Sequence, residues 1–402
     1  MEKMEKMQTV KSPEFQDNSE KKTNLQNECQ NKLNHFHKEK KDTTYETDST
    51  SSILAVSPST RSVTDNIDIR ILHGVDYDNE LLLKEEDDRF GAIFPVRYPD
   101  IWDSYEKQRS AHWDVDEVHL ENDYKDWVTL TENQQYFLTH VLVFFALSDL
   151  IVNANLKLNV IDKIKVLEAV FTYDCQIHME NIHSIMYAKI IECYIKDDLK
   201  KKEIFNEIEK FPAIKKKQDW CYRWINKPTV TIQESLIAFA CVEGIFFSGS
   251  FASILYFRKS NKLPGLGQAN RLIMKDEASH YGFACLLYRN YIENKLPTSL
   301  VEQIVREAVE LEIEFMCEAL PVALLGMNND LMAEHIKYVG DCLLINIGLK
   351  PIYKVGKSPF SFADIMSTDN KENFFEKDAA EYNKAGVGLK EEDKIFTMDA
   401  DF

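Results

Sequence analysis

The sequence lacks the short motifs that mark several common enzyme classes. It contains no phosphate-binding loop of the GxxxxGK type, no serine nucleophile elbow and no Cys-x-x-Cys pair. Strand-like alternation is scarce, and no repeat occurs at the period of a solenoid. Gly265 and Gly267 follow a proline in an expected loop between helices, without the strand that precedes a dinucleotide-binding turn. Nothing in these patterns favours a nucleotide-binding protein or a serine hydrolase.

Positive charge is also in short supply. The chain has 48 Lys and Arg against 66 Asp and Glu, which argues against a nucleic-acid partner. Seven of the eight cysteines lie within apolar helical sequence, so we expect reduced core residues of a cytoplasmic protein rather than disulfides. The first ten residues contain no apolar core, and we do not expect a signal peptide there.

One apolar run, residues 236–255, is long enough to span a bilayer. It carries a charge at its centre, Glu243, together with internal serines and glycines. No second apolar span is available to shield that carboxylate within a membrane bundle. We therefore expect a buried helix in a large helical core, and no membrane partner.

Three regions differ in composition. Residues 1–75 are rich in Lys, Glu, Asn, Ser and Thr and contain no glycine before Gly74, so we expect a disordered N-terminal tail. Helical periods dominate residues 76–367, which predicts an all-α domain. Residues 368–402 turn polar and end in the acidic segment FTMDADF, so we expect a flexible C-terminal tail.

A Glu-x-x-His pattern occurs twice in expected helices, as Glu180 with His183 and as Glu277 with His280. Residues three apart lie on one face of a helix, so each turn can offer a metal ion one oxygen and one nitrogen. With the abundance of Glu and His in this chain, about one such pattern is expected by chance. The repeat alone therefore does not establish a metal site.

Two isolated carboxylates strengthen the case. Asp149 is the only charge in the apolar stretch 137–152, and Glu243 is the only charge in 236–255. An ionised carboxylate in such surroundings costs several kcal/mol unless it is paired or bound to a metal. Two Glu-x-x-His turns plus a carboxylate from each of two further helices are typical of ferritin-like di-iron and di-manganese proteins. The predicted metal ligands are Asp149, Glu180, His183, Glu243, Glu277 and His280.

These ligands also define their surroundings. One stripe of the first ligand helix carries Gln176, Glu180, His183 and Tyr187. The stripe predicts that Tyr187 lies close to the metals, although a core tyrosine with a satisfied hydroxyl has the same pattern. Phe247 and Phe251 extend the face of Glu243 and predict a dry, unreactive wall around the site. Ligands rich in oxygen and free of thiolate suit iron or manganese better than structural zinc.

Four segments carry a family resemblance: HVLVFFALSD, MENIHSIMY, AFACVEGIFFSGSFASI and KDEASHYGFACLLY. They closely resemble the small, radical-generating subunit of class Ia ribonucleotide reductase. The likeness runs from about Phe90 to Phe402 and leaves the N-terminal tail outside. It implies a ferritin-like helical bundle with additional helices around a buried dinuclear site. It further implies two iron ions in an oxo-bridged centre, with manganese less favoured, and a homodimer with itself or a paralogue.

The resemblance also assigns roles to single residues. Tyr187 stands at the position of a stable tyrosyl radical, and Trp102, in YPDIWDSY, matches the tryptophan of the radical-transfer path. Asp276 matches the carboxylate that links this tryptophan to His183, and Tyr382, in AEYNKAGV, matches a tail tyrosine that relays the radical. Taken singly, Trp102 could be ordinary packing, Asp276 an ion-pair partner and Tyr382 a tail aromatic.

The C-terminal segment 396–402 has aromatic ends, Phe396 and Phe402, with acidic residues between them. Such a segment suits docking into a complementary groove, and in the family it recruits the large subunit. The implied reaction is reduction of ribonucleoside diphosphates to deoxyribonucleoside diphosphates. Two departures stand out. Lys275 replaces the usual Arg before Asp276, and His178 is an additional histidine that we expect to be structural.

Three alternatives remain open from the sequence. Another di-iron carboxylate oxidase would need a substrate cavity beside the metals and would have no use for Tyr187 or the terminal segment. A ferritin-like iron-storage protein predicts a shorter chain and assembly into a cage. A catalytically silent scaffold homologue would bind the partner without forming the radical.

Overall fold

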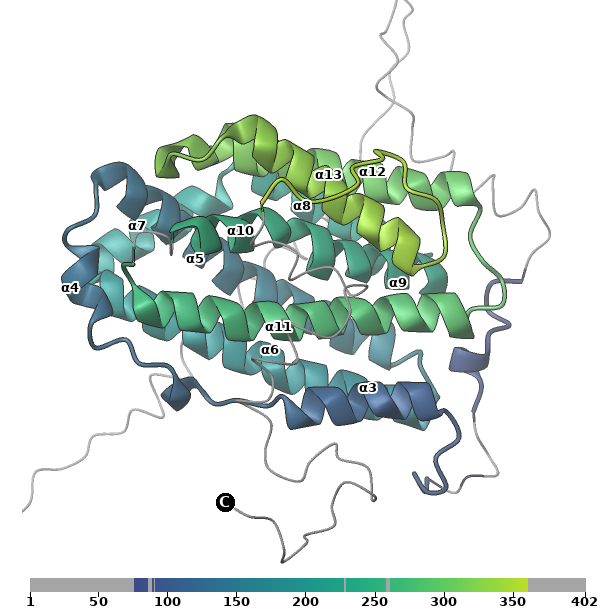
Figure 1. Cartoon of the computed structure of the whole chain (residues 1–402). Coiled ribbons are helices and arrows are strands. Elements are labelled where there is room, and N and C mark those ends of the chain that lie inside the picture. Colours follow the sequence, from purple (N-terminus) through teal and green to yellow (C-terminus); the bar gives the residue numbers. More distant parts are fainter. Residues whose placement is uncertain (1–75, 86–88, 90, 228, 258–260, 361–402) are drawn as a thin grey trace, which may run out of the picture. The chain divides into compact units, whose positions relative to one another are not determined.

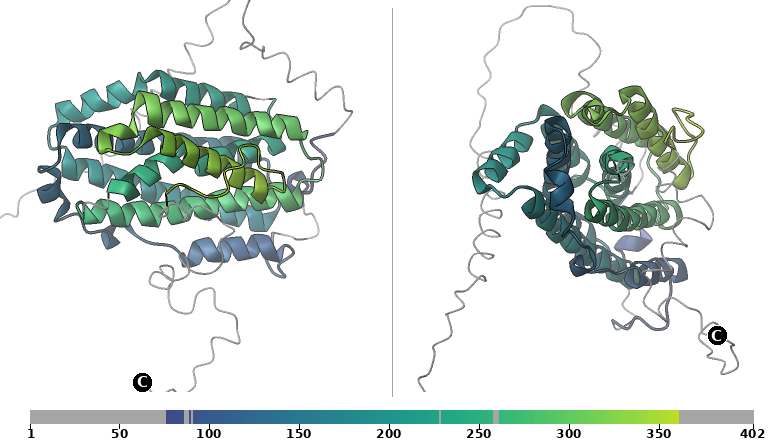
Figure 2. Two further views of the ribbon diagram at one scale, coloured as in Figure 1. Left: turned by 45° about the horizontal axis from the view of Figure 1, so that its top comes forward. Right: turned by 60° about the vertical axis from the view of Figure 1, so that its left-hand side comes forward.

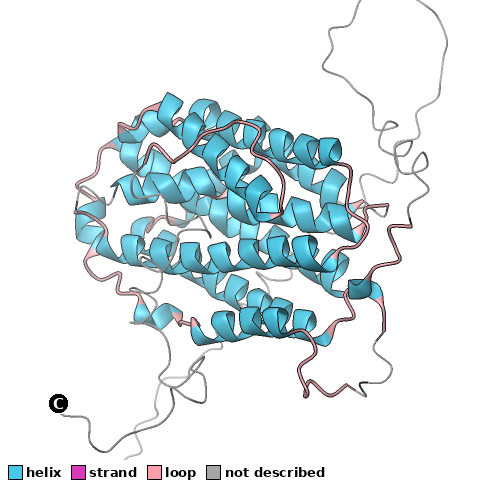
Figure 3. Cartoon of the chain, turned by 45° about the vertical axis from the view of Figure 1, so that its right-hand side comes forward, coloured by secondary structure: helices cyan, strands magenta, loops and turns pink. Residues whose placement is uncertain are grey.

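The computed structural model describes residues 76–85, 89, 91–227, 229–257 and 261–360. Within these residues the chain is built from helices joined by loops, without a strand, as Figure 3 shows. The all-α prediction is therefore confirmed for the described part of the chain. The two expected tails, residues 1–75 and 368–402, lie outside the described residues, so these boundaries stay predictions. The described residues all fall within one compact unit, Arg70–Phe402.

Five helices form the part of the bundle that matters most for function. They are α5 (Glu132–Asn155), α6 (Leu167–Tyr194), α9 (Ile232–Cys241), α10 (Ser248–Phe257) and α11 (Pro264–Leu286). Helix α5 packs on α6, and α11 packs on α6, α9 and α10. In the right-hand view of Figure 2 many of these helices are seen nearly end-on, which shows that their axes run close to parallel.

The remaining helices surround this group. The longer ones are α3 (Pro99–Ser110), α7 (Asp198–Glu209), α8 (Pro212–Cys221), α12 (Thr298–Glu314) and α13 (Asn329–Asn346), with the short α4 (Asp123–Trp127). In Figure 1, α3, α6 and α11 run side by side, and contacts join each pair of them. Single 3-10 turns occur at Leu81–Leu83, Val115–Glu117 and Val322–Leu325.

Among the described residues, five segments are wound as π-helices, at Leu156–Ile161, Tyr222–Asn226, Val242–Phe246, Leu287–Tyr291 and Phe315–Ala319. A π-turn inserts one extra residue into a helix and often marks a functional site. The third of these segments joins α9 to α10 and contains Glu243. The apolar run expected from the sequence is thus one helical segment that is rewound at its only charge.

Local sequence explains where the ligand helices begin. Thr131 and Gln134 form a capping box before α5: the Gln134 amide donates to Thr131 Oγ1 at 3.3 Å, and the Thr131 amide donates to Gln134 Oε1 at 3.1 Å. Helix α11 starts at Pro264, whose missing N–H costs nothing at that position. Buried Asp123 accepts hydrogen bonds from the next two amides, each at 2.8 Å, which satisfies donors that the helix leaves open.

The glycines after Pro264 correct one expectation. Gly265 and Gly267 were expected in a loop, but both lie in the first turn of α11. A Cβ atom at Gly265 would lie 2.5 Å from the carbonyl oxygen of His119. Glycine is therefore needed for close backbone packing at the helix start, because any side chain would displace the neighbouring loop.

Ile232–Phe257 is the one helical segment of the described chain that is long and apolar enough to cross a membrane. Its most apolar window is fully buried within the protein. Such complete burial is typical of a core helix and confirms the expected position of residues 236–255. The seven cysteines in the described residues are all free thiols, as expected.

A buried ion pair joins two of the outer helices, α8 and α12, to α10 in the core. The Lys217 ammonium on α8 contacts the Glu312 carboxylate on α12, and the Gly249 amide on α10 donates to the same carboxylate at 3.2 Å. Burial raises the pKa of Glu312 to about 7 despite that partner. The ammonium also lies 4.3–4.8 Å from three ring centroids, those of Phe144, Phe246 and Phe315.

Candidate metal centre

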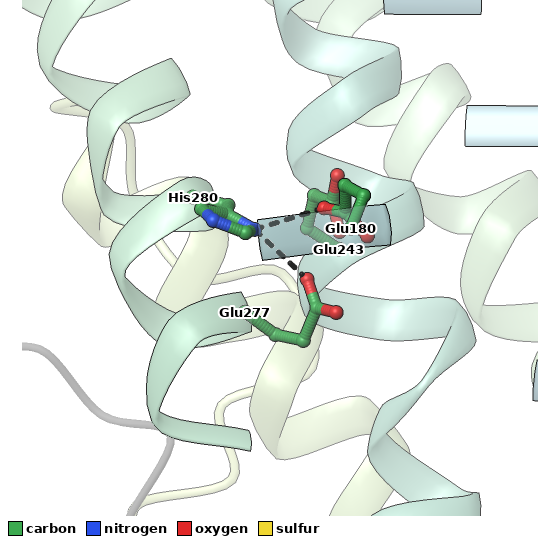
Figure 4. A group of neighbouring side chains, drawn as sticks. All are labelled: Glu180, Glu243, Glu277 and His280. Carbon is green, nitrogen blue, oxygen red and sulfur yellow. Dashed lines mark hydrogen bonds and ion pairs between the residues drawn. The ribbon is translucent and has the colours of Figure 1, made fainter. Parts of the chain in front are cut away.

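The six predicted ligands come from four helical segments and meet in the core. Asp149 lies on α5, Glu180 and His183 on α6, Glu243 in the π-helix, and Glu277 and His280 on α11. All six side chains are almost completely buried. Figure 4 shows the carboxylates of Glu180 and Glu277 turned toward the His280 ring, with Glu243 beside Glu180.

The donor atoms form two overlapping groups. Glu180, Glu243, Glu277 and His280 place ligand atoms within 4.8 Å of one another, and so do Asp149, Glu180 and His183. Glu180 belongs to both groups. Glu277 also faces both imidazoles, with oxygens 3.1 Å from His183 Nδ1 and 3.2 Å from His280 Nδ1. The arrangement fits two metal ions: Glu180, which belongs to both groups, and Glu277, which faces both imidazoles, would be shared ligands, and Asp149 and Glu243 would each complete one group.

Unpartnered atoms support a metal rather than an internal hydrogen-bond network. Three buried carboxylate oxygens of the ligand set have no hydrogen-bond partner: Asp149 Oδ2, Glu180 Oε2 and Glu243 Oε2. An unsatisfied buried polar group costs about 1–3 kcal/mol, more if charged. Such a concentration in one place is explained if lone pairs are directed at metal ions. The residues present therefore fit a dinuclear centre.

Electrostatics point the same way. Burial, reinforced by neighbouring carboxylates, raises the pKa of Asp149 and of Glu243 well above the usual value for an acid. Burial alone would also raise the pKa of Glu277, but hydrogen bonds with His183 and His280 hold it below its usual value. These raised pKa values favour the protonated forms of Asp149 and Glu243. Metal binding must displace those protons, as it does in other carboxylate sites.

The stripe expected on α6 is buried along its whole length, at Gln176, Glu180, His183 and Tyr187. The Gln176 amide donates to Glu243 at 3.1 Å and lies 3.5 Å from Glu180. The sequence placed this glutamine on the ligand face but gave it no role. The structure shows that it ties a ligand of the π-helix to a ligand of α6.

Tyr187 sits in an aromatic enclosure beside the ligands. Its ring stacks on Phe145, with centroids 4.9 Å apart and planes 7° apart. Phe145 in turn contacts Phe247 and Phe251, at 5.6 and 4.8 Å between centroids. Burial, followed by the charge of Asp149, raises the pKa of Tyr187 well above its usual value. The expected apolar wall is thus present, and the phenol inside it is held protonated.

Behind His183 the structure corrects the sequence prediction. His183 Nε2 lies 3.0 Å from Asp276 Oδ2, as expected, but the indole that donates to the same oxygen, at 2.7 Å, belongs to Trp113. The assignment of this contact to Trp102 was wrong. Trp113 is buried and its ring lies over His183, with centroids 6.1 Å apart.

Trp102 lies elsewhere. It is part of α3 and packs against Phe94, Tyr105 and Phe171 on a partly exposed face of α3 and α6. Both tryptophans occur within twelve residues of one another, in YPDIWDSY and in SAHWDVDEV. The signal that distinguishes them is position: Trp102 is inside a helix with an exposed side, and Trp113 follows its end, where the chain turns toward the core.

The other predicted residues are placed as follows. His178 is exposed on α6 and stacks on His112, with centroids 5.0 Å apart, which agrees with a structural role. Lys275 precedes Asp276 on α11 and is partly buried. Tyr382 and the segment from Phe396 to Phe402 lie outside the described residues.

Comparison with known proteins decides the family. The family model described as ribonucleotide reductase, small chain, matches residues 92–359. The chain belongs to this family. It is 46% identical to ribonucleoside-diphosphate reductase subunit M2 of Danio rerio over 325 residues, which cover 81% of this chain and 83% of that protein. It is 44% identical to the small chain of Plasmodium falciparum, with coverage of 81% and 92%.

Solved structures agree with this small-chain assignment. The ribonucleotide reductase Rnr4 homodimer from Saccharomyces cerevisiae has a TM-score of 0.68 and 32% identity, with coverage of 79% of this chain and 96% of that one. The R2 subunit from Clostridium botulinum, at 22% identity and a TM-score of 0.60, shares the fold. The chain is thus a ferritin-like small subunit of ribonucleoside-diphosphate reductase, an oxidoreductase that works with a large subunit.

Proposed function

We propose that this small subunit binds two iron ions and forms a radical on Tyr187 for use by the large subunit in reducing ribonucleoside diphosphates. The observation that carries the proposal is the position of Tyr187. Its phenol is buried, protonated and enclosed by aromatic rings, on the same helix face as the metal ligands. The donor set suits iron and manganese alike, and we favour iron because of the family resemblance.

The metal centre supplies, together with oxygen, the oxidant for this chemistry. Tyr187 gives up one electron and its phenolic proton, and thereby becomes a neutral radical. Burial and, after it, the charge of Asp149 raise the pKa of this phenol, so the proton stays on Tyr187 until the residue is oxidised. Phe145, Phe247 and Phe251 keep water and small reductants away from the radical.

The alternatives lose support for a specific reason. A storage protein or a general oxidase has no need of a protonated tyrosine in a dry aromatic enclosure. A silent scaffold has no need of a buried ligand cluster in which carboxylate oxygens of Asp149, Glu180 and Glu243 lack hydrogen-bond partners. All of these features are present together in the chain.

Replacing Tyr187 by Phe tests the radical site. The variant should bind two iron ions as the wild type does but form no persistent tyrosyl radical, because the ring keeps its packing and loses the oxidisable hydroxyl. Electron paramagnetic resonance on metal-free protein supplied with ferrous iron and oxygen measures this. Tyr173→Phe, another buried tyrosine on α6, is the matched control and should keep the signal. An undiminished signal in Tyr187→Phe would refute the assignment, and iron uptake without any wild-type radical would favour storage, oxidase or scaffold.

We further propose that the radical leaves through His183, Asp276 and Trp113, which the hydrogen bonds connect in that order. Trp113→Phe should leave iron binding and the Tyr187 signal intact, yet reduce nucleotide reduction with the large subunit to background. Phenylalanine lacks the N–H donor and is harder to oxidise than indole. Trp102→Phe should retain most of the activity because Trp102 lies outside this chain of contacts. The proposal fails if the two variants behave alike in coupled assays.

The C-terminal tail is proposed to dock the large subunit, with Phe396 and Phe402 as aromatic anchors and Tyr382 as the relay. Deleting residues 396–402 should leave the radical signal unchanged and abolish reduction through lost binding. The peptide FTMDADF added in excess should inhibit the full-length chain for the same reason. Full activity of the truncated protein at low subunit concentration would rule out this docking role, and Tyr382→Phe separates relay from docking because binding should persist.

Self-association is proposed through the aromatic face of α3 and α6. Phe94 is 69% exposed and Phe171 is 38% exposed, and with Trp102 and Tyr105 they form a continuous cluster of rings. Exposed apolar clusters of this kind mark interaction sites, and the solved Rnr4 relative is a homodimer. A second copy, or a paralogue, is therefore the proposed occupant.

Phe171→Lys should shift the full chain from dimer toward monomer in sedimentation velocity, because a charge would be buried in the interface. Helical circular dichroism should not change. Leu199→Lys, at an exposed apolar residue on α7, is the control and should not affect the association. A wild-type monomer at micromolar concentration, or an unchanged Phe171→Lys dimer, would exclude this face.

A further inference from the structure

Gly244 makes an unusually close contact at the metal centre. It follows the ligand Glu243 directly, inside the π-helix Val242–Phe246. A Cβ atom built on Gly244 would lie 2.8 Å from Cδ2 and 3.0 Å from Cε2 of Tyr281. The tyrosine ring therefore rests against the bare backbone next to a metal ligand, at a distance that no other residue type permits without movement.

Tyr281 cannot easily yield. Its side chain is almost completely buried, and the Asn346 amide on α13 donates to its hydroxyl at 2.7 Å. Cys285, one turn further along α11, is also buried. The ring is thus attached to α11 through its own backbone and held at its far end by α13. A side chain added at Gly244 must therefore displace either the Tyr281 ring or the π-helix.

The sequence position of Tyr281 makes this contact relevant to the metals. It follows the ligand His280 and lies one turn beyond the ligand Glu277 on α11. On the opposite side, Gly244 follows Glu243. The contact therefore lies between the two helical segments that carry Glu243 on one side and Glu277 and His280 on the other. The size of the groups in contact determines how closely these segments approach.

We propose that the Gly244–Tyr281 contact is a spacer that sets the distance between the Glu243 side and the Glu277–His280 side of the dinuclear site. Tyr281 is then a positioning residue, with no part in radical formation. The inference rests on the proposed metal-binding function. A larger side chain at position 244, or a smaller one at position 281, should therefore impair the binding of two adjacent metal ions before it impairs the fold.

The test uses manganous ion without oxygen, so that no turnover is involved. The wild-type chain should bind two ions, whose magnetic coupling gives an electron paramagnetic resonance signal distinct from that of isolated manganous ions. Gly244→Ala should lose the coupled signal and bind its second ion about 10- to 100-fold more weakly, the usual cost of disturbing groups behind a metal ligand. Gly244→Ala with Tyr281→Leu should recover the coupled signal, because the smaller side chain makes room for the added methyl group.

Gly249→Ala is the matched control. Gly249 follows the same π-helix, in α10, and an added Cβ there would meet Met316 and Glu312 at 2.5 and 2.7 Å, away from the ligands. This variant should lose thermal stability and keep the coupled pair. Tyr281→Phe retains the ring without its hydroxyl and should keep most of the coupling, whereas Tyr281→Leu alone should weaken it.

The outcomes separate cleanly. A coupled wild-type-like signal in folded Gly244→Ala overturns the spacer, and so does a loss that Tyr281→Leu fails to restore. If Gly244→Ala does not fold, Tyr281→Leu alone decides, and full coupling in that variant overturns the spacer. If the wild-type chain binds no metal pair at all, the proposed function fails instead, and the spacer has no site to serve.

Discussion

Four carboxylates in one dry site are the constraint on which the rest of this structure depends. Asp149, Glu180, Glu243 and Glu277 repel one another, and their burial removes them from the bulk solvent that would screen them. Two imidazoles compensate part of this charge, and burial raises the pKa of Asp149 and of Glu243, which favours protons on these two carboxylates. A pair of divalent ions replaces those protons with stronger counter-charge. The fold therefore maintains a strained arrangement of acids whose natural partner is a metal pair.

Maintaining that arrangement requires rigid supports around each ligand. Glu243 is fixed from two directions, by the Gln176 amide and by the tyrosine ring that presses on the neighbouring Gly244. Asp123 secures the start of α11, the helix that carries Glu277 and His280, through two backbone amides. The supports come from residues distant in sequence. Their shared effect is that the ligand atoms cannot relax apart to relieve the repulsion.

The sequence predicted what depends on local periodicity and missed what depends on long-range contacts. The ligands were recognisable because Glu-x-x-His spacing defines a helix face and because a lone charge in an apolar helix needs a partner. Tyr187 followed from the same stripe. The choice between Trp102 and Trp113 could not follow from spacing, because it depends on which indole reaches a carboxylate on α11. The role of Gly244 was equally hidden, since only the folded chain brings Tyr281 against it.

The two ligand histidines differ in the contacts of their Nε2 atoms, and this difference makes the two sides of the site unequal. His183 Nε2 is joined to Asp276 and through it to Trp113, which forms a continuous polar path out of the ligand cluster. His280 Nε2 has no hydrogen-bond partner among the described residues, and the next residue, Tyr281, is wedged against the π-helix. The His183 side of the centre is therefore linked by hydrogen bonds to Trp113, whereas the His280 side is held by packing of Tyr281 against the π-helix. A radical that must leave a buried site without being quenched needs a single defined path. The hydrogen bonds from His183 through Asp276 to Trp113 offer such a path on one side of the site.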